Sequence, residues 1–308
     1  YYAVCRVVGT KEKPVKVRVA PGEFTNYENE PFPLTLSSYV SLSGDCDSPP
    51  ILNAEDADVA LYTHFASHQS IEHIHVKNSR EVGIHIYSAE NVTISNCDIM
   101  NTSLGIISNG TGVRFESCRI HDNGSMGILV EQAGSVSIHH CNIHDNQTAI
   151  LARDLTTVYI ESSRLHDNFN TDFPGGLYLG PDSNLTVVNS YIYRNSNNNT
   201  MSSGYSGGGL YLANNSSSEL FNTVIADNYG YSGGAVTIAE LASARFTNCT
   251  IIDNRAAHRE RLWWTPAKVK LYWSPGKAGG FLIGLMDVQM PVMDGVEATR
   301  IIRRGDLG

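Results

Sequence analysis

The 308 residues include 42% hydrophobic and 17% charged side chains, which is enough to bury a sizeable core and excludes a chain that functions through disorder. The formal net charge of −9 opposes a broad electrostatic grip on nucleic acid or on an anionic membrane surface. No stretch approaches the roughly 18 apolar residues that a membrane-spanning helix needs. We therefore expect no nucleic-acid partner and no membrane span. The sequence opens at Tyr1 rather than at methionine, which favours a start farther upstream.

One motif recurs along most of the chain: apolar residues two positions apart, followed by a position that usually holds a small residue. The aligned position reads Ile74, Cys97, Cys118, Cys141, Ser163, Ser190, Thr223 and Cys249 in successive units. The period is about 22 residues, which is typical of a solenoid repeat. Alternation at two-residue spacing predicts short strands rather than helices.

Each unit carries a second apolar segment that begins with glycine or alanine, as in Gly83–Ile86, Gly127–Val130 and Gly176–Leu179. Such a unit cannot bury its apolar side alone. Stacked units pair each strand with its counterpart about 4.8 Å above and below, and so form one continuous core. The repeat therefore predicts an all-β parallel solenoid with about 22 residues per coil, forming one domain over residues 1–258.

Two sets of residues resemble known repeat families. The first set, which resembles the right-handed parallel β-helix of the pectate-lyase-like superfamily, is Val15–Phe24, Phe32–Leu36 and Val40–Gly44. The second set, which also resembles the repeats of bacterial polymorphic surface proteins, is Gly233–Ala235 and Phe246–Asn254. The resemblance covers residues 15–258 and implies the fold, an extracellular or cell-envelope location and a polysaccharide or surface partner. It leaves the activity open, because this superfamily includes lyases, hydrolases, epimerases, adhesins and scaffolds.

Equal positions of stacked coils form columns, and two columns are predicted to point inward. The first column contains the thiols of Cys97, Cys118, Cys141 and Cys249. They alternate in phase with inward isoleucines, so we interpret them as small buried core residues. The second column closes the first strand and predicts a ladder of side-chain amides that hydrogen-bond from coil to coil. Its members are Asn123, Asn146, Asn168, Asn195, Asn228 and Asn254.

A histidine column, His121, His144 and His166, lies beside Asp122, Asp145 and Asp167. We interpret these residues as outward-facing and solvated on a turn edge. The alternative is a transition-metal site, because imidazoles about 5 Å apart provide nitrogen ligands. We expect no bound metal and no other cofactor.

An outward stripe along the second strand changes from aliphatic to aromatic. It reads His85, Ile107, Leu129, Leu151, Tyr178 and Tyr211. Two insertions, residues 169–175 and 196–207, precede its tyrosines. One interpretation is a carbohydrate groove with Tyr178, Tyr211, Tyr205 and Asp172 as ligand-binding residues. The other is a structural stripe that a loop covers.

Catalytic signals are weak in this sequence. The paired aspartates of polygalacturonase-like hydrolases and the calcium-binding aspartates with arginine of the lyases are not recognisable. Asp154, Asp172 and Arg153 are the only candidates placed to reach a substrate on the tyrosines. We therefore predict a monomer that binds polysaccharide or a surface partner without catalysis. The alternative is a polysaccharide lyase or hydrolase that acts in the groove.

The tail departs from the repeat. Residues 259–280 contain all three tryptophans and predict a junction or cap over the end of the solenoid. Residues 281–308, with Met290-Pro291 and Asp294-Gly295, resemble the middle of a response-regulator receiver domain, which implies one strand, one helix and Asp287 as phosphoacceptor. Phosphorelay signalling through this segment, in a cytoplasmic protein, is a second alternative function. The acidic pair that would hold Mg²⁺ is not found upstream, so we expect Asp287 to remain unphosphorylated.

Overall fold

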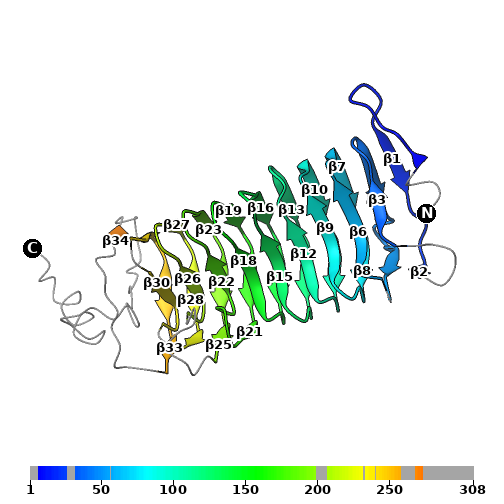
Figure 1. Ribbon diagram of the computed structural model, residues 1–308. Coiled ribbons are helices and arrows are strands. Elements are labelled where there is room, and N and C mark those ends of the chain that lie inside the picture. The colour runs from blue at the N-terminus through cyan, green and yellow to red at the C-terminus, as the bar shows by residue number, and fades with distance from the viewer. Residues whose placement is uncertain are drawn as a thin grey trace, which may run out of the picture.

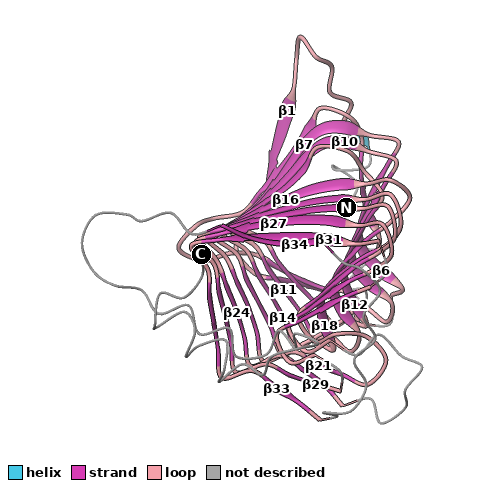
Figure 2. Cartoon of the chain, turned by 90° about the vertical axis from the view of Figure 1, so that its left-hand side faces the viewer, coloured by secondary structure: helices cyan, strands magenta, loops and turns pink. Residues whose placement is uncertain are grey.

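The computed structural model describes residues 6–25, 32–55, 57–198, 207–231, 233–239 and 241–257, together with the backbone of residues 268–272. All of its named elements are β-strands, which stack in parallel as successive coils along one axis (Figure 1). Viewed along that axis, three long sheets enclose the core (Figure 2). We name them sheets A, B and C in the order in which the chain visits them. The predicted parallel solenoid is therefore confirmed.

Sheet A has eleven strands. They are β1 (Val15–Arg18), β4 (Val40–Ser43), β7 (Ser67–Glu72), β10 (Glu90–Ser95), β13 (Val113–Glu116), β16 (Ser135–His139), β19 (Thr157–Glu161), β23 (Asn184–Val188), β27 (Ser217–Phe221), β31 (Ser243–Thr247) and β34 (Lys268–Tyr272).

Sheet B has ten strands. They are β2 (Glu23–Thr25), β5 (Ile51–Asn53), β8 (His75–Lys77), β11 (Asp98–Met100), β14 (Arg119–His121), β17 (Asn142–His144), β20 (Arg164–His166), β24 (Tyr191–Tyr193), β28 (Val224–Ala226) and β32 (Thr250–Ile252).

Sheet C has nine strands, and a short sheet D of four strands lies beside the last coils. Sheet C contains β3 (Leu34–Leu36), β6 (Val59–His64), β9 (Val82–Tyr87), β12 (Leu104–Ser108), β15 (Met126–Val130), β18 (Thr148–Ala152), β22 (Leu177–Leu179), β26 (Leu210–Leu212) and β30 (Val236–Ile238). Sheet D contains β21 (Phe169–Asn170), β25 (Ser196–Asn197), β29 (Tyr229–Gly230) and β33 (Arg255–Ala256).

Tight turns keep the coils in register. In the coil of β13, Ser117 turns the chain from sheet A to sheet B with φ 53°, and Asp122 turns it toward sheet C with φ 54°. The equivalent residues of later coils, such as His140 and Asp145, are also left-handed. Asp and Asn tolerate this conformation better than most residues because their short polar side chains bond locally. One left-handed residue therefore makes each of these two corners.

Inward side chains form one continuous core along the axis. Strand alternation places Phe115 inside sheet A between Ile94 and Ile138 of the neighbouring coils, and all three are fully buried. The thiols predicted to face inward are buried too, and the backbone N–H of Cys118 lies 3.4 Å from Sγ of Cys141 in the next coil.

The predicted asparagine ladder forms between sheets B and C. Asn168 is fully buried, and its Nδ2 donates to Oδ1 of Asn195 at 2.8 Å and to the carbonyl oxygen of His166 at 2.9 Å. Its own Oδ1 accepts from the backbone N–H and Nδ2 of Asn146. Each amide thus satisfies the polar groups of its corner and joins two coils.

The solenoid runs from β1 to β33. Beyond it, β34 pairs in parallel with β31 and adds one more strand to sheet A. The rest of the predicted tryptophan-rich cap and the receiver-like segment with Asp287 lie outside the described residues. Among the residues that the structure describes, none forms a helix of the length and hydropathy needed to cross a membrane.

Candidate functional site

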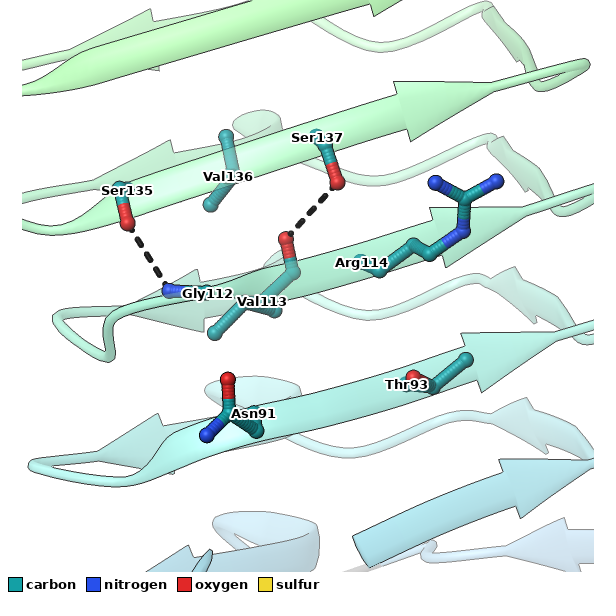
Figure 3. A pocket seen from close by; sticks show the side chains of 8 residues that line it. All are labelled: Asn91, Thr93, Gly112, Val113, Arg114, Ser135, Val136 and Ser137. Atoms are coloured by element: carbon teal, nitrogen blue, oxygen red, sulfur yellow. Dashed lines mark hydrogen bonds between the residues drawn. The ribbon is translucent and has the colours of Figure 1, made fainter. Parts of the chain in front are cut away.

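A shallow depression of about 360 Å³ crosses β10, β13 and β16 on the outer face of sheet A (Figure 3). Its lining is Asn91, Thr93, Gly112, Val113, Arg114, Ser135, Val136 and Ser137. Most of these side chains carry amide, hydroxyl or guanidinium groups that can bond a polar ligand. We call this depression with its polar surroundings the sheet A groove.

Gly112 makes room in the sheet A groove. Its φ is +64°, and a Cβ there would lie 2.8 Å from Oδ1 of Asn91. Its backbone N–H donates to Oγ of Ser135 in the next coil at 2.9 Å. A larger residue would therefore be strained in this backbone and would fill the floor of the groove.

A hydrogen-bonded chain of polar side chains borders the groove. Arg114 pairs with Glu116 and donates from Nη1 to Nε2 of His139 at 2.8 Å. Nδ1 of His139 lies 3.2 Å from Oε2 of Glu161, which also accepts from the hydroxyl of Tyr159 at 3.2 Å. A guanidinium has no acceptor, so Nε2 of His139 accepts and Nδ1 carries the proton toward Glu161.

This chain of contacts sets what the groove can do chemically. The Nε2 lone pair of His139 is occupied by Arg114, so this imidazole is not poised to remove a proton from a ligand. The contacts instead hold planar donors and acceptors in fixed positions across neighbouring coils. Such an arrangement suits the hydroxyl groups of a ligand, because the ordering cost has been met during folding.

Arg114, His139 and Glu161 are not among the site residues predicted from the sequence. All three occupy outward positions of sheet A strands, whereas the predicted columns lie at inward positions and on sheets B and C. A usable signal existed, because the aligned repeat places glutamate at 116, histidine at 139 and glutamate at 161 in one outward column.

The predicted histidine column lies on the outer face of sheet B as a continuous stack of rings. The ring centroids of His121 and His144 are 4.8 Å apart, those of His144 and His166 are 5.0 Å apart, and Tyr193 continues the stack at 4.8 Å. Each histidine Nδ1 lies within 2.7 Å of the aspartate that follows it in sequence. The left-handed turn residues therefore orient the imidazoles.

Contrary to the prediction, these imidazoles are largely shielded from solvent. Their side chains are only 8%, 15% and 13% exposed in chain order, because each ring covers the faces of its neighbours. The rings of His121 and His144 are within 5° of parallel, and those of His144 and His166 within 9°. Their nitrogens point alike rather than toward a common point, and each Nδ1 already has a carboxylate partner. The metal alternative stays a prediction that this geometry does not favour.

Two histidines of the stack have pKa values shifted in opposite directions. A hydrogen bond to Asp98 at 2.8 Å, supported by Asp122, raises the pKa of His121 against the opposing effect of burial. Burial lowers the pKa of His166, against the opposing effect of Asp167. As the pH falls, His121 therefore takes up its proton before His166 does.

Replacing Arg194 by alanine is expected to raise the pKa of Asp167. Arg194 donates from Nε and Nη2 to this carboxylate at 2.7 and 2.5 Å and lowers its pKa to about 2. The pKa of an aspartate in the unfolded chain is about 3.9, so the pair stabilises the fold above that pH and loses its effect as the pH falls toward about 2. Solvent screening limits the stabilisation at neutral pH to about 1 kcal/mol or less.

Carboxyl NMR titration of both proteins measures this change. The control is Arg164→Ala, which removes another exposed arginine from sheet B and should leave the pKa of Asp167 unchanged. An Asp167 pKa that is the same with and without Arg194 would show that the pair does not form in solution.

The outward stripe of sheet C is covered over its middle. Leu129, Leu151 and Tyr178 are 6%, 2% and 6% exposed, and Phe173 packs against Tyr178 with ring centroids 5.4 Å apart. Tyr211 is half-buried and stacks on Tyr178 at 5.6 Å. The loop that carries Phe173 thus contributes to the cover, while the predicted carbohydrate groove remains a prediction.

The other predicted site residues are dispersed along the sheet C side. Arg153 follows β18 and forms an ion pair with Glu131 at 3.8 Å. Asp154 is exposed beside it, and Asp172 is exposed in the loop after β21. Tyr205 lies outside the described residues. Their role in catalysis or binding stays a prediction.

Known proteins share this repeat and this architecture. A family described as "Right handed beta helix region" matches residues 53–161, 82–199 and 126–260, which together span more than half of the sequence. The chain belongs to the right-handed β-helix family. The matched region ends before the receiver-like segment, and no curated protein matches the chain by sequence.

Solved structures of other β-helix proteins are similar in fold. Pectate lyase Pel9A matches with a TM-score of 0.51 and 14% identity, over 91% of this chain and 77% of that protein. An alginate lyase from Paenibacillus sp. strain FPU-7 matches with a TM-score of 0.59 and 11% identity, over 83% of this chain and 95% of the lyase.

A phage protein has a similar TM-score. Tailspike protein 2 of the Escherichia coli bacteriophage CAB120 matches with a TM-score of 0.61 and 10% identity, over 84% of this chain. The match covers only 38% of the tailspike chain. At these identities the likeness shows the fold and not the activity.

Proposed function

We propose that this β-helix protein binds a polysaccharide along the outer face of sheet A and does so without cleaving it. The sheet A groove carries the proposal, because it combines a depression open to solvent with ordered hydroxyl, amide and guanidinium groups from successive coils. A linear polymer of sugars presents hydroxyl groups at regular intervals, and a solenoid presents donors and acceptors at intervals of about 4.8 Å.

Two further points support this function. Proteins of similar fold include ones named pectate lyase and alginate lyase, whose names indicate action on polysaccharides. The bond from Arg114 to Nε2 of His139 favours binding over catalysis, since it occupies the lone pair that a general base would use. An extracellular or cell-envelope location fits such a ligand and is part of the proposal.

Arg114→Ala is expected to weaken polysaccharide binding about tenfold. A hydrogen bond from a charged donor contributes about 1.5 to 3 kcal/mol, and a tenfold change in Kd corresponds to about 1.4 kcal/mol. The wild-type chain is first screened on an array of neutral and acidic polysaccharides, and the Kd for the strongest ligand is then measured by calorimetry.

Arg245→Ala is the matched control. Arg245 lies on the same outer face in β31 and also pairs with a glutamate, Glu219 at 3.8 Å, but it is far from the groove along the axis. Equal affinity of the wild type and Arg114→Ala would remove the groove as the binding site. A wild type that binds nothing on the array would overturn the function, and release of unsaturated or shortened sugar chains would overturn its non-catalytic character.

A further inference from the structure

A cluster of aromatic rings is open to solvent on sheet C, at the other end of the stripe from Tyr178. We call it the aromatic platform, and its members are Tyr62, His64, Phe65, His85 and Tyr87. They come from β6, β9 and the turn residue after β6. His64 and Phe65 are exposed and the other three are half-buried.

The rings of the aromatic platform are in mutual contact. Tyr62 stacks on His64 at 5.3 Å between ring centroids, and His64 lies 4.2 Å from Phe65 and 5.1 Å from Tyr87. His85 lies 5.0 Å from Tyr62 and 6.0 Å from Tyr87. Two adjacent coils thus present one aromatic surface.

Phe65 combines an unfavourable backbone conformation with an exposed side chain. Its φ is 49°, a left-handed conformation that a bulky side chain rarely adopts, and its residue surface is 68% exposed. This backbone is strained for a bulky residue, and little of the ring is buried in return. Folding therefore gains little from a phenyl ring at this position, and most of its surface is accessible to a ligand.

The middle of the stripe and the aromatic platform differ in what covers them. Around Leu129, Leu151 and Tyr178 the protein covers the stripe with its own side chains, among them Phe173. The aromatic platform continues the same outward column through Tyr62 and His85, where Phe65 and His64 remain exposed. The platform is thus an accessible part of the column.

The chemistry of the aromatic platform favours a sugar without net charge. Four of its five rings carry a polar atom beside an aromatic face, the combination that matches the C–H faces and hydroxyl groups of a pyranose. Glu131, the carboxylate that acts electrostatically on His85, is paired with Arg153 at 3.8 Å. Burial lowers the pKa of His85, which keeps this ring neutral at neutral pH.

The aromatic platform meets the sheet A groove at a corner. β9 ends at Tyr87, and β10 carries Asn91 of the groove four residues later. At this corner the backbone N–H of Ser88 donates to Oδ1 of Asn109 at 2.6 Å, and Nδ2 of Asn109 donates to Gln132 at 2.9 Å. Polar amides therefore connect the two surfaces.

We propose that the aromatic platform stacks the faces of neutral sugar rings and extends the sheet A groove around this corner. The proposal deepens the proposed function, since it names a second subsite and the class of sugar that occupies it. Stacking supplies the apolar part of recognition, and the groove supplies the hydrogen bonds.

Phe65→Asn tests the aromatic platform without endangering the fold. Asparagine accepts a left-handed backbone, so the melting temperature is expected to stay the same or rise. Affinity electrophoresis of the full chain in gels that contain soluble glucan, mannan or xylan should show about tenfold weaker retention, by analogy with aromatic stacking on nucleobases. Tyr87→Ala should weaken binding similarly, and Tyr87→Phe should preserve it because the ring remains.

The control is Tyr191→Ala, which removes a 48% exposed ring from sheet B and should not alter retention. Unchanged retention of Phe65→Asn and Tyr87→Ala would overturn the aromatic platform, even if Arg114→Ala weakens binding and so supports the groove. If the platform variants lose retention while Arg114→Ala is retained like the wild type, the result would support the platform and contradict the groove. A wild type that none of the three polymers retards would overturn the platform.

Discussion

Asn168→Ala is expected to lower the free energy of unfolding by about 3 to 5 kcal/mol. The side chain is fully buried and in contact with both neighbouring coils, through Asn146 on one side and Asn195 on the other. Alanine would leave the backbone N–H and amide of Asn146, and the carbonyl oxygens of Ile143 and His166, without this partner. Each buried polar group left unsatisfied costs about 1 to 3 kcal/mol.

Urea denaturation followed by far-UV circular dichroism measures this effect. Asn184→Ala is the matched control, because Asn184 is an exposed asparagine at the start of β23 and its loss should change stability by less than about 0.5 kcal/mol. Similar denaturation midpoints for the two variants would show that the ladder contributes little to stability.

Phe115→Ala is expected to destabilise the fold by about 3 to 5 kcal/mol. Phe115 is fully buried in sheet A, and alanine would remove most of the ring and leave a cavity beside Ile94 and Ile138. The cost combines the lost burial of apolar surface with the lost contacts of the cavity wall. Because each coil contacts mainly its neighbours, the middle of the solenoid should unfold first.

Hydrogen exchange followed by mass spectrometry tests where the Phe115 variant opens. Protection is expected to fall in β10, β13 and β16 and to persist in β27 and β31. Phe115→Leu should recover part of the stability, since it refills part of the cavity. A loss of stability below about 1 kcal/mol in Phe115→Ala, or a uniform loss of protection, would contradict the central packing role.

The strand repeat, the inward columns and the turns could be predicted from the sequence because they depend on spacing alone. Alternation at two residues determines which side of a strand faces the core, so the burial of Cys118 and of Asn168 follows from their phase relative to isoleucine and valine. The repeat of about 22 residues then requires that equal positions stack. Sheet D and β34 were not predicted from the sequence. The strands of sheet D follow the asparagines of the ladder but are only two residues long, too short to show alternation, and β34 lies beyond the last repeat.

The outward face was decided by the tertiary structure, because what covers an outward side chain comes from other coils and from loops. Shielding of His144 depends on rings that lie one coil above and below it. Burial of Tyr178 depends on Phe173, and the contact from Arg114 to His139 joins residues 25 positions apart. Phase within a strand determines that a residue points outward, and only the packing of its neighbours determines whether it meets water, another ring or a ligand.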